Sequence, residues 1–169
     1  ILQQVKDVDA VVVPVGGGGL ISGVALAVKS MNPKVQVYGV QASGAASMVT
    51  SLHDHKIECL PSVSTIADGI AVKQPGPLTF EYCSRYVDDI VTVTDEEICA
   101  AILALIEKRK MIAEGAGATP VAAIMAGKLP QLKGKKVCCV VSGGNIDVTI
   151  LSRVITRGLV MSGRQCTLN

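Results

Sequence analysis

Four consecutive glycines stand between an apolar segment and a helical pattern, and no other feature of the sequence constrains the fold as strongly. The apolar segment is 10–15, the glycines occupy 16–19, and the helical pattern runs over 20–31. Only glycine adopts positive φ freely and places no Cβ between the main chain and a ligand, so several amides can point at one anion. A helix directly behind the loop adds its unpaired N–H groups and positive dipole end. Each extra glycine costs conformational entropy, so four in succession predict a phosphate-binding loop.

The residues that follow the glycines limit which class of phosphate ligand the loop can bind. A nucleotide triphosphate loop needs Lys-Ser/Thr after its last glycine, and here Leu20 follows. In a dinucleotide fingerprint the third glycine would fall on Ile21 or Ser22. The next strand would then end in an acidic residue, where this chain has Gln41. The pattern therefore favours a compact monophosphate that is bound by main-chain groups alone.

Strand and helix patterns alternate along the chain. Short Val-rich segments that are apolar throughout are typical of parallel strands buried on both faces: 10–15, 35–41, 90–94 and 137–141. Helical patterns cover 20–31, 77–87, 115–126 and 145–157, and Gly158 is expected to end the last of them. A further helix is expected to begin at the cap Thr94 and to run to about Lys110. The segment 43–76 has neither pattern. We therefore expect one α/β domain with an open, mostly parallel sheet and helices on both faces.

Composition excludes several classes of function. Of the 169 residues, 49% are hydrophobic, which is enough for one substantial core. The formal charge is +2 and the sixteen basic residues are scattered, so neither nucleic-acid binding nor anionic-membrane binding is expected. No apolar run approaches the ~20 residues of a membrane span, which makes the cytoplasm the expected location. The six cysteines lack a Cys-x-x-Cys pair and are expected to be buried thiols, with Cys138 and Cys139 on opposite faces of a strand.

A second glycine turn follows the last apolar segment. Ser142 is succeeded by two glycines and Asn145, again with a helical pattern behind them. Ligands in open α/β sheets bind at the carboxyl ends of the strands, so the two turns are expected to meet at one crevice. Ser142 is then a candidate hydrogen-bonding group within that crevice.

Five motifs resemble those of the threonine dehydratases, in the same order along the chain: 13–23, 65–69, 87–91, 114–117 and 142–145. The resemblance covers nearly the whole chain. Threonine dehydratases are pyridoxal-phosphate (PLP) enzymes of fold type II, the fold of the tryptophan synthase β subunit, and serine racemase is a close relative. The resemblance implies that PLP is the cofactor and that its phosphate is bound by Gly16, Gly17, Gly18, Gly19 and the amide of Leu20.

The resemblance also assigns groups around the cofactor ring. Ser142 matches the serine that meets the pyridine nitrogen, and a hydroxyl there leaves that nitrogen largely neutral. Asp68, Gly69 and Glu114 match residues that line the same pocket. Taken without the resemblance, these three residues are a simple turn and an acid at the start of a helix. We assign them to the pocket without a proton-transfer role.

Two motifs of the family have no counterpart here. The Schiff-base lysine motif, Ser-Phe-Lys-x-Arg-Gly, and the loop that binds the substrate carboxylate belong to the upstream half of the full-length enzymes. We therefore expect residues 1–169 to be a fragment of the catalytic region, and we assign no catalytic residue in it. The polar surroundings of Lys29, Lys73 and Lys108 differ from the desolvated setting that a nucleophilic lysine needs.

No metal site is expected either. Serine racemase binds a metal through a glutamate after the second strand and an aspartate six residues later, and these positions are Gln41 and Ser47 here. A His-Asp-His sequence occupies 53–55. Two histidines two apart point roughly 200° apart on a helix, so a surface turn is the preferred interpretation.

The resemblance implies that the full-length enzyme dehydrates and deaminates threonine, with serine as a second substrate, to 2-oxobutyrate or pyruvate and ammonia. It further implies that the full-length enzyme is a homo-oligomer, either a dimer or a tetramer. It also implies a role in amino-acid metabolism, such as isoleucine biosynthesis. Residues 158–160 and 164–168 resemble the lead into an ACT-type regulatory domain. The chain alone is expected to be inactive. Two alternatives stay open: serine racemase or another β-eliminating enzyme of this fold, and a non-catalytic domain that binds a phosphate ligand.

Overall fold

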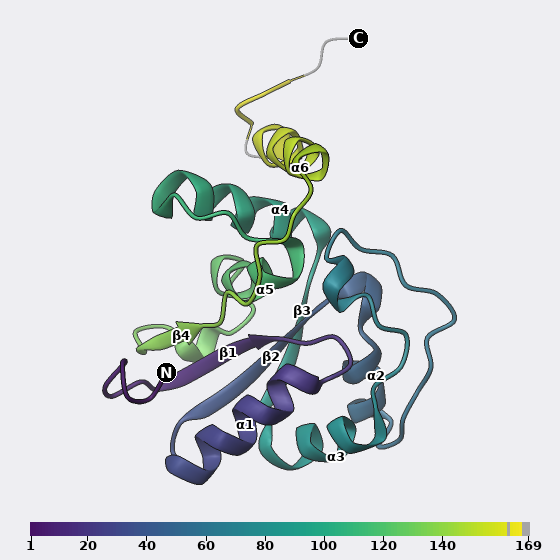
Figure 1. The fold of residues 1–169 in the computed structure, drawn as a ribbon, viewed down its shortest axis with the longest axis vertical. Coiled ribbons are helices and arrows are strands. Elements are labelled where there is room, and N and C mark those ends of the chain that lie inside the picture. The colour runs from purple at the N-terminus through teal and green to yellow at the C-terminus, as the bar shows by residue number, and fades with distance from the viewer. Residues whose placement is uncertain (162, 167–169) are drawn as a thin grey trace.

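Four parallel strands form a single sheet at the centre of the molecule (Figure 1). The structure is a computed structural model that describes residues 1–161 and 163–166. The strand order is β3-β2-β1-β4, and the bounds are Ala10–Pro14 for β1, Gln36–Ala42 for β2, Asp89–Val93 for β3 and Val137–Cys139 for β4. Each strand begins and ends within two residues of its predicted position. The expected parallel α/β sheet is confirmed.

Helices cover both faces of the sheet, which explains why its strands are apolar throughout. One face carries α1 (Gly19–Met31), α2 (Ser47–His53) and α3 (Pro77–Tyr86), and the other carries α4 (Asp95–Ala104) and α5 (Gly115–Met125) (Figure 1). Alternate residues of β1 enter the two cores: Val11 and Val13 pack on the α1 side, whereas Val12 packs on the α5 side. The last helix, α6 (Val148–Met161), packs on α4 and lies outside these layers.

The cysteines follow this layering only in part. Cys138 packs against the core on the α1 side and Cys139 against the core on the α5 side, as the strand pattern predicts. Cys83 and Cys99 are buried. Cys59 and Cys166, however, are exposed, because they lie in irregular segments outside both cores, so the expectation of six buried thiols is wrong for these two.

The segment 43–76 is more ordered than its sequence indicates. It contains the 3-10 turn Ser43–Ala45, helix α2 and the 3-10 turn Asp68–Ile70. Helix α2 has only seven residues, too few to display a helical period in the sequence. Its first turn is held instead by a distant group, since the Val49 N–H donates to the side-chain carbonyl of Gln41 at 2.9 Å.

Helix α4 begins with a complete capping box. The Thr94 hydroxyl accepts from the Glu97 N–H at 3.3 Å, and the Glu97 carboxylate accepts from the Thr94 N–H at 2.8 Å. The helix continues as a π-helical turn over Leu105–Arg109 and ends at Lys110, which has a φ of 56°. The predicted start and end of this helix are both confirmed.

Helix α6 departs from its prediction at both ends. It begins at Val148 rather than residue 145, because Asp147 caps it by accepting from the Thr149 N–H at 2.7 Å. It also passes through Gly158, which was expected to end it. A Cβ on Gly158 would lie 3.1 Å from Leu103 Cδ2, so this glycine permits a close approach to α4 instead of terminating the helix. Of the segment expected to lead into a further domain, residues 167 and 168 lie outside the described part.

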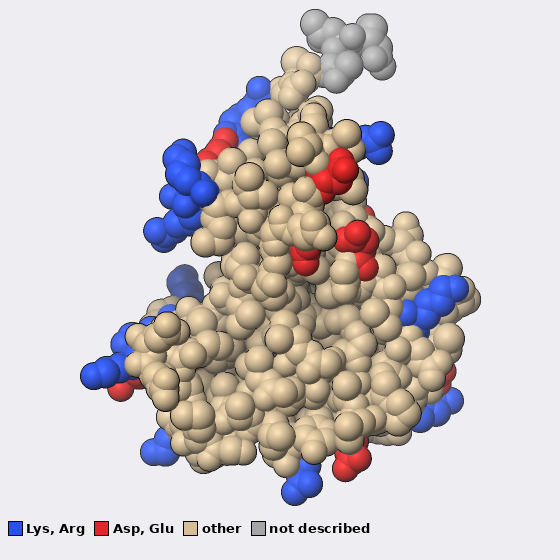
Figure 2. Space-filling view, in the orientation of Figure 1, with Lys and Arg blue, Asp and Glu red and all other residues tan. Residues whose placement is uncertain are grey.

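None of the helices in the described part of the chain is long and apolar enough to cross a membrane. On the face seen in Figure 2, lysines and arginines lie in separate groups near the periphery and form no continuous patch.

Replacing Thr94 with alanine is expected to lower the free energy of unfolding by about 1 kcal/mol, because the Glu97 N–H loses its acceptor. Thr94→Ser keeps the hydroxyl and should retain most of the wild-type stability. Urea unfolding followed by circular dichroism measures both variants. If the free energy of unfolding falls equally in the alanine and serine variants, the capping hydroxyl does not stabilise the helix.

Cys83 should react with iodoacetamide far more slowly than the exposed Cys59 at pH 8. Burial raises the pKa of the Cys83 thiol to about 11, so at pH 8 only about one molecule in a thousand carries the reactive thiolate. The reaction at Cys83 should therefore speed up as the pH rises towards that pKa. Timed labelling of the native protein with peptide mass spectrometry measures both rates, and similar rates at pH 8 would contradict the burial of Cys83.

Candidate functional site

One pocket of about 230 Å³ gathers residues that are far apart in the sequence. It lies where β1 ends and α1 begins. Its lining consists of Pro14, Gly16, Gly17, Gly18, Gly19, Leu20, Gly69, Ile70, Glu114, Ala116 and Ser142. The glycine loop, Leu20 and Ser142 are thus brought together, as the convergence of the two glycine turns predicts, and Gly69 and Glu114 line the same pocket. We call this space the cradle pocket.

The glycine loop has no room for a side chain at its tightest point. Gly18 is the N-cap of α1 and has a φ of 93°, a left-handed conformation that L residues rarely adopt. A Cβ there would lie 2.6 Å from Met48 Cε and 2.9 Å from Thr79 Cβ. At Gly19, in contrast, a Cβ would meet no atom within 4 Å. The loop is therefore packed tightly at Gly18 and open at Gly19.

The start of α1 leaves its first amide groups without a side-chain acceptor. Within the described part of the chain no side chain caps the helix, and its first turn contains no acidic residue. The unpaired N–H groups and the positive dipole end of a 13-residue helix therefore face the cradle pocket. Such an arrangement suits an anion.

The second glycine turn interlocks with the start of α5. The Glu114 N–H donates to the Gly143 carbonyl at 3.1 Å. A Cβ on Gly143 would collide with the Glu114 carboxylate, and a Cβ on Gly117 would lie 2.8 Å from the Gly143 oxygen. Position 117 must therefore be glycine for α5 to pack against the main chain of this turn, whereas a side chain at 143 would displace the Glu114 carboxylate. The contact sets Ser142 at the edge of the cradle pocket.

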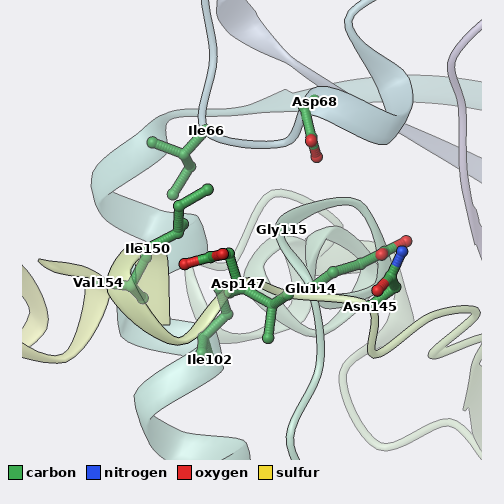
Figure 3. A pocket seen from close by; sticks show the side chains of 10 residues that line it. Ile66, Asp68, Ile102, Glu114, Gly115, Asn145, Asp147, Ile150 and Val154 are labelled. Carbon is green, nitrogen blue, oxygen red and sulfur yellow. The ribbon is translucent and has the colours of Figure 1, made fainter. Parts of the chain in front are cut away.

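A second pocket, of about 280 Å³, shares Glu114 with the cradle pocket. Figure 3 shows the side chains of Asp68, Glu114, Asn145 and Asp147 around it, together with isoleucines and Val154. We call it the acidic pocket. The Thr149 hydroxyl donates to the Asp147 carboxylate and holds the pKa of that carboxyl below its usual range. Asp68 thus lines the acidic pocket, whereas its neighbour Gly69 lines the cradle pocket.

Two side chains form hydrogen bonds behind the glycine loop that the sequence did not predict. The Thr79 hydroxyl, from α3, donates to the Gly17 carbonyl at 2.5 Å. The Gln41 amide, from β2, donates to the Gly16 carbonyl at 3.4 Å and is fully buried. Nothing in the sequence near Thr79 signals this contact, because α3 lies about sixty residues from the loop.

Neither pocket has a lysine among its lining residues. Lys29 pairs with Asp88 at 2.7 Å, and Lys73 and Lys108 are exposed. None of these three lysines therefore lines the cradle pocket or the acidic pocket.

The residues considered above as metal ligands either have other hydrogen-bond partners or stand alone. The carbonyl oxygen of Gln41 accepts from Val49, and the buried Ser47 hydroxyl has no hydrogen-bond partner among the described residues. His53 contacts Asp54 at 2.7 Å on the surface, with 86% of its side chain exposed. Across the described residues, no three His, Cys, Asp or Glu side chains gather in a way that could hold a metal ion.

Comparison of the sequence with known proteins agrees with the resemblance to threonine dehydratases. Residues 1–143 match the profile of a family described as "Pyridoxal-phosphate dependent enzyme". The L-threonine ammonia-lyase of Thermotoga maritima is 56% identical over 165 residues, which are 98% of this chain and 41% of that protein.

Solved structures agree with the sequence relatives. The processed form of threonine deaminase isoform 2 from Solanum lycopersicum is 38% identical and has a TM-score of 0.88, covering 94% of this chain and 44% of its own. Maize serine racemase is 37% identical and has a TM-score of 0.84, covering 92% of this chain and 50% of its own.

The resemblance to threonine dehydratases is thus confirmed, and the fold is that of the fold-type II enzymes. The chain spans less than half the length of the Thermotoga maritima relative. On the profile match and these identities, the chain belongs to the family of pyridoxal-phosphate dependent enzymes.

Proposed function

We propose that this chain supplies the cofactor cradle of a PLP-dependent threonine ammonia-lyase. The full-length protein would convert L-threonine to 2-oxobutyrate and ammonia, and L-serine to pyruvate and ammonia. One observation carries the proposal: a single pocket is lined by the glycine loop, Ser142, Gly69 and Glu114 together. The 56% identity to an L-threonine ammonia-lyase favours this activity over others of the same fold.

The chemistry of the cradle pocket suits the phosphate of PLP. Its glycine loop exposes main-chain amides, and the uncapped start of α1 adds positive potential. The open space at Gly19 leaves room for phosphate oxygens, and the amide of Leu20 follows in the same turn. We therefore assign Gly16, Gly17, Gly18, Gly19 and Leu20 to the phosphate.

Bound PLP supplies an electron sink that stabilises negative charge at the substrate Cα. This chain's residues hold and orient the ring. The Ser142 hydroxyl can donate to the pyridine nitrogen, which leaves that nitrogen largely neutral and favours prompt elimination. Glu114 stands between the cradle pocket and the acidic pocket, so its carboxylate and that of Asp68 would lie beside a ring held by Ser142.

The remaining machinery is proposed to lie outside these 169 residues. The lining residues include no Schiff-base lysine, and the chain covers 41% of the Thermotoga maritima relative. We place the lysine and the substrate-carboxylate loop in an upstream part, and an ACT-type regulatory domain downstream. We propose a cytoplasmic homo-oligomer, a dimer or a tetramer, that acts in amino-acid metabolism, with isoleucine biosynthesis as one route.

Serine racemase activity is the second candidate, because the maize enzyme shares the fold at 37% identity. A non-catalytic phosphate-binding domain is the third, and it suits the chain in isolation. The three candidates differ in product: 2-oxobutyrate from L-threonine, D-serine from L-serine, or none.

Purified full-length protein loaded with PLP is expected to release 2-oxobutyrate from L-threonine, because both halves of the site are then present. The 2-oxo acid is measured with a coupled lactate dehydrogenase assay, and D-serine by chiral chromatography. The 169-residue chain serves as the control and should release neither product. D-serine as the main product would favour the second candidate, and no product from the full-length protein would rule out both enzymes.

Gly18→Ala in the full-length protein is expected to weaken PLP binding by at least about tenfold, because the added methyl strains a left-handed residue and collides with Met48 and Thr79. Gly127→Ala is the matched control, since Gly127 also has positive φ, at 66°, but faces open space away from both pockets. Equilibrium dialysis of the apoproteins against PLP measures both. Equal losses would mean that backbone strain alone, and not the cradle, explains the effect.

A further inference from the structure

The carbonyl groups of the glycine loop need donors of their own. When several successive amides point at one anion, the carbonyls of the same peptides point away from it. A carbonyl turned into the protein must find a donor, because an unsatisfied buried polar group costs about 1–3 kcal/mol. The donors behind the loop therefore determine whether its amides can stay directed at the pocket.

Thr79 is such a donor. Its hydroxyl lies 2.5 Å from the Gly17 carbonyl and 3.0 Å from the Gly76 carbonyl. A hydroxyl has one proton, and the Gly17 carbonyl is the nearer of its two acceptors. The proton of Thr79 is therefore directed to Gly17. The Cβ of Thr79 also packs behind Gly18, so one side chain fixes two adjacent peptides of the loop.

Gln41 acts on the preceding peptide. Its side chain is fully buried at the end of β2 and bonds at both ends, donating to the Gly16 carbonyl at 3.4 Å and accepting from the Val49 N–H at 2.9 Å. Because both of its groups are engaged, the amide cannot turn without breaking a bond. Gln41 thus links the first residue of the loop to α2, as Thr79 links the second to α3.

We propose that Thr79 and Gln41 are positioning residues that hold the Gly17 and Gly16 carbonyls away from the cofactor phosphate, so that the loop amides face it. Neither side chain lines the cradle pocket, so they act through the loop peptides and not on the cofactor. This inference rests on the proposed assignment of the loop to the phosphate of PLP.

The test compares two ligands that differ only in phosphate, PLP and pyridoxal. In the full-length apoprotein, Thr79→Val keeps the shape of the side chain and removes the donor. The dissociation constant for PLP is expected to rise about tenfold, which corresponds to roughly 1.4 kcal/mol, while that for pyridoxal stays within about twofold. Thr79→Ser restores the hydroxyl and should restore PLP binding. Gln41→Met should act in the same direction with a smaller effect, because its contact is longer.

A spectroscopic measurement and a matched control accompany the binding data. The phosphorus-31 resonance of bound PLP should shift in Thr79→Val and return in Thr79→Ser, because it reports the hydrogen bonds made to the phosphate. Thr50→Val removes a similar hydroxyl bond, from Thr50 to the Ala46 carbonyl at 3.0 Å, at a site that does not touch the loop. This control should change neither the PLP-to-pyridoxal ratio nor the resonance.

The outcomes separate this inference from the function on which it rests. If wild-type protein binds PLP no better than pyridoxal, the phosphate assignment itself fails. If wild-type protein prefers PLP and Thr79→Val keeps the same ratio and resonance, the positioning role is overturned and the function stands. An equal loss for both ligands in Thr79→Val also overturns it, because it indicates a general structural role. Should Thr79→Val not fold, Thr79→Ala takes its place and the same ratio decides.

Discussion

The start of α1 can present its amides to an anion only if nothing projects from the loop that leads into it and every carbonyl of that loop is held elsewhere. Much of the fold around the site follows from this requirement. Met48 of α2 and Thr79 of α3 fill the space behind Gly18, and Gln41 of β2 reaches Gly16. The 3-10 turn Asp68–Ile70 closes the loop from another side, since Ile70 Cα lies 3.1 Å from the Cβ position of Gly16. A loop without side chains is thus shaped by side chains from four other segments.

The parallel sheet solves a second requirement, which is to bring the two glycine turns to one place. Strands β1 and β4 are neighbours and run in the same direction, so the turns that follow them leave the sheet at the same edge. Helix α5 packs against the second of these turns, because position 117 carries no side chain and the Glu114 N–H donates to the Gly143 carbonyl. The cradle pocket is therefore fixed by main-chain packing on two sides.

Sequence reasoning recovered the features that depend on local pattern. The strands, the helices α1, α3, α4 and α5, and the convergence of the glycine loop with Ser142 all follow from periodicity, capping residues and glycine chemistry. Features that depend on tertiary contact were missed. Helix α2 is too short to show a period, and Gly158 signals a helix end unless the proximity of Leu103 is known. The contacts of Thr79 and Gln41 with the loop depend on which elements pack behind it, and no spacing in the sequence reveals that.

Helix α6 gives the acidic pocket one wall that belongs to neither layer of the sheet. Ile150 and Val154 of α6 line this pocket together with Ile66 and Ile102 (Figure 3). The position of that wall depends on how closely α6 approaches α4, and Gly158 allows the approach. The width of the acidic pocket is therefore set in part by a helix–helix contact that lies outside the sheet and away from both glycine turns.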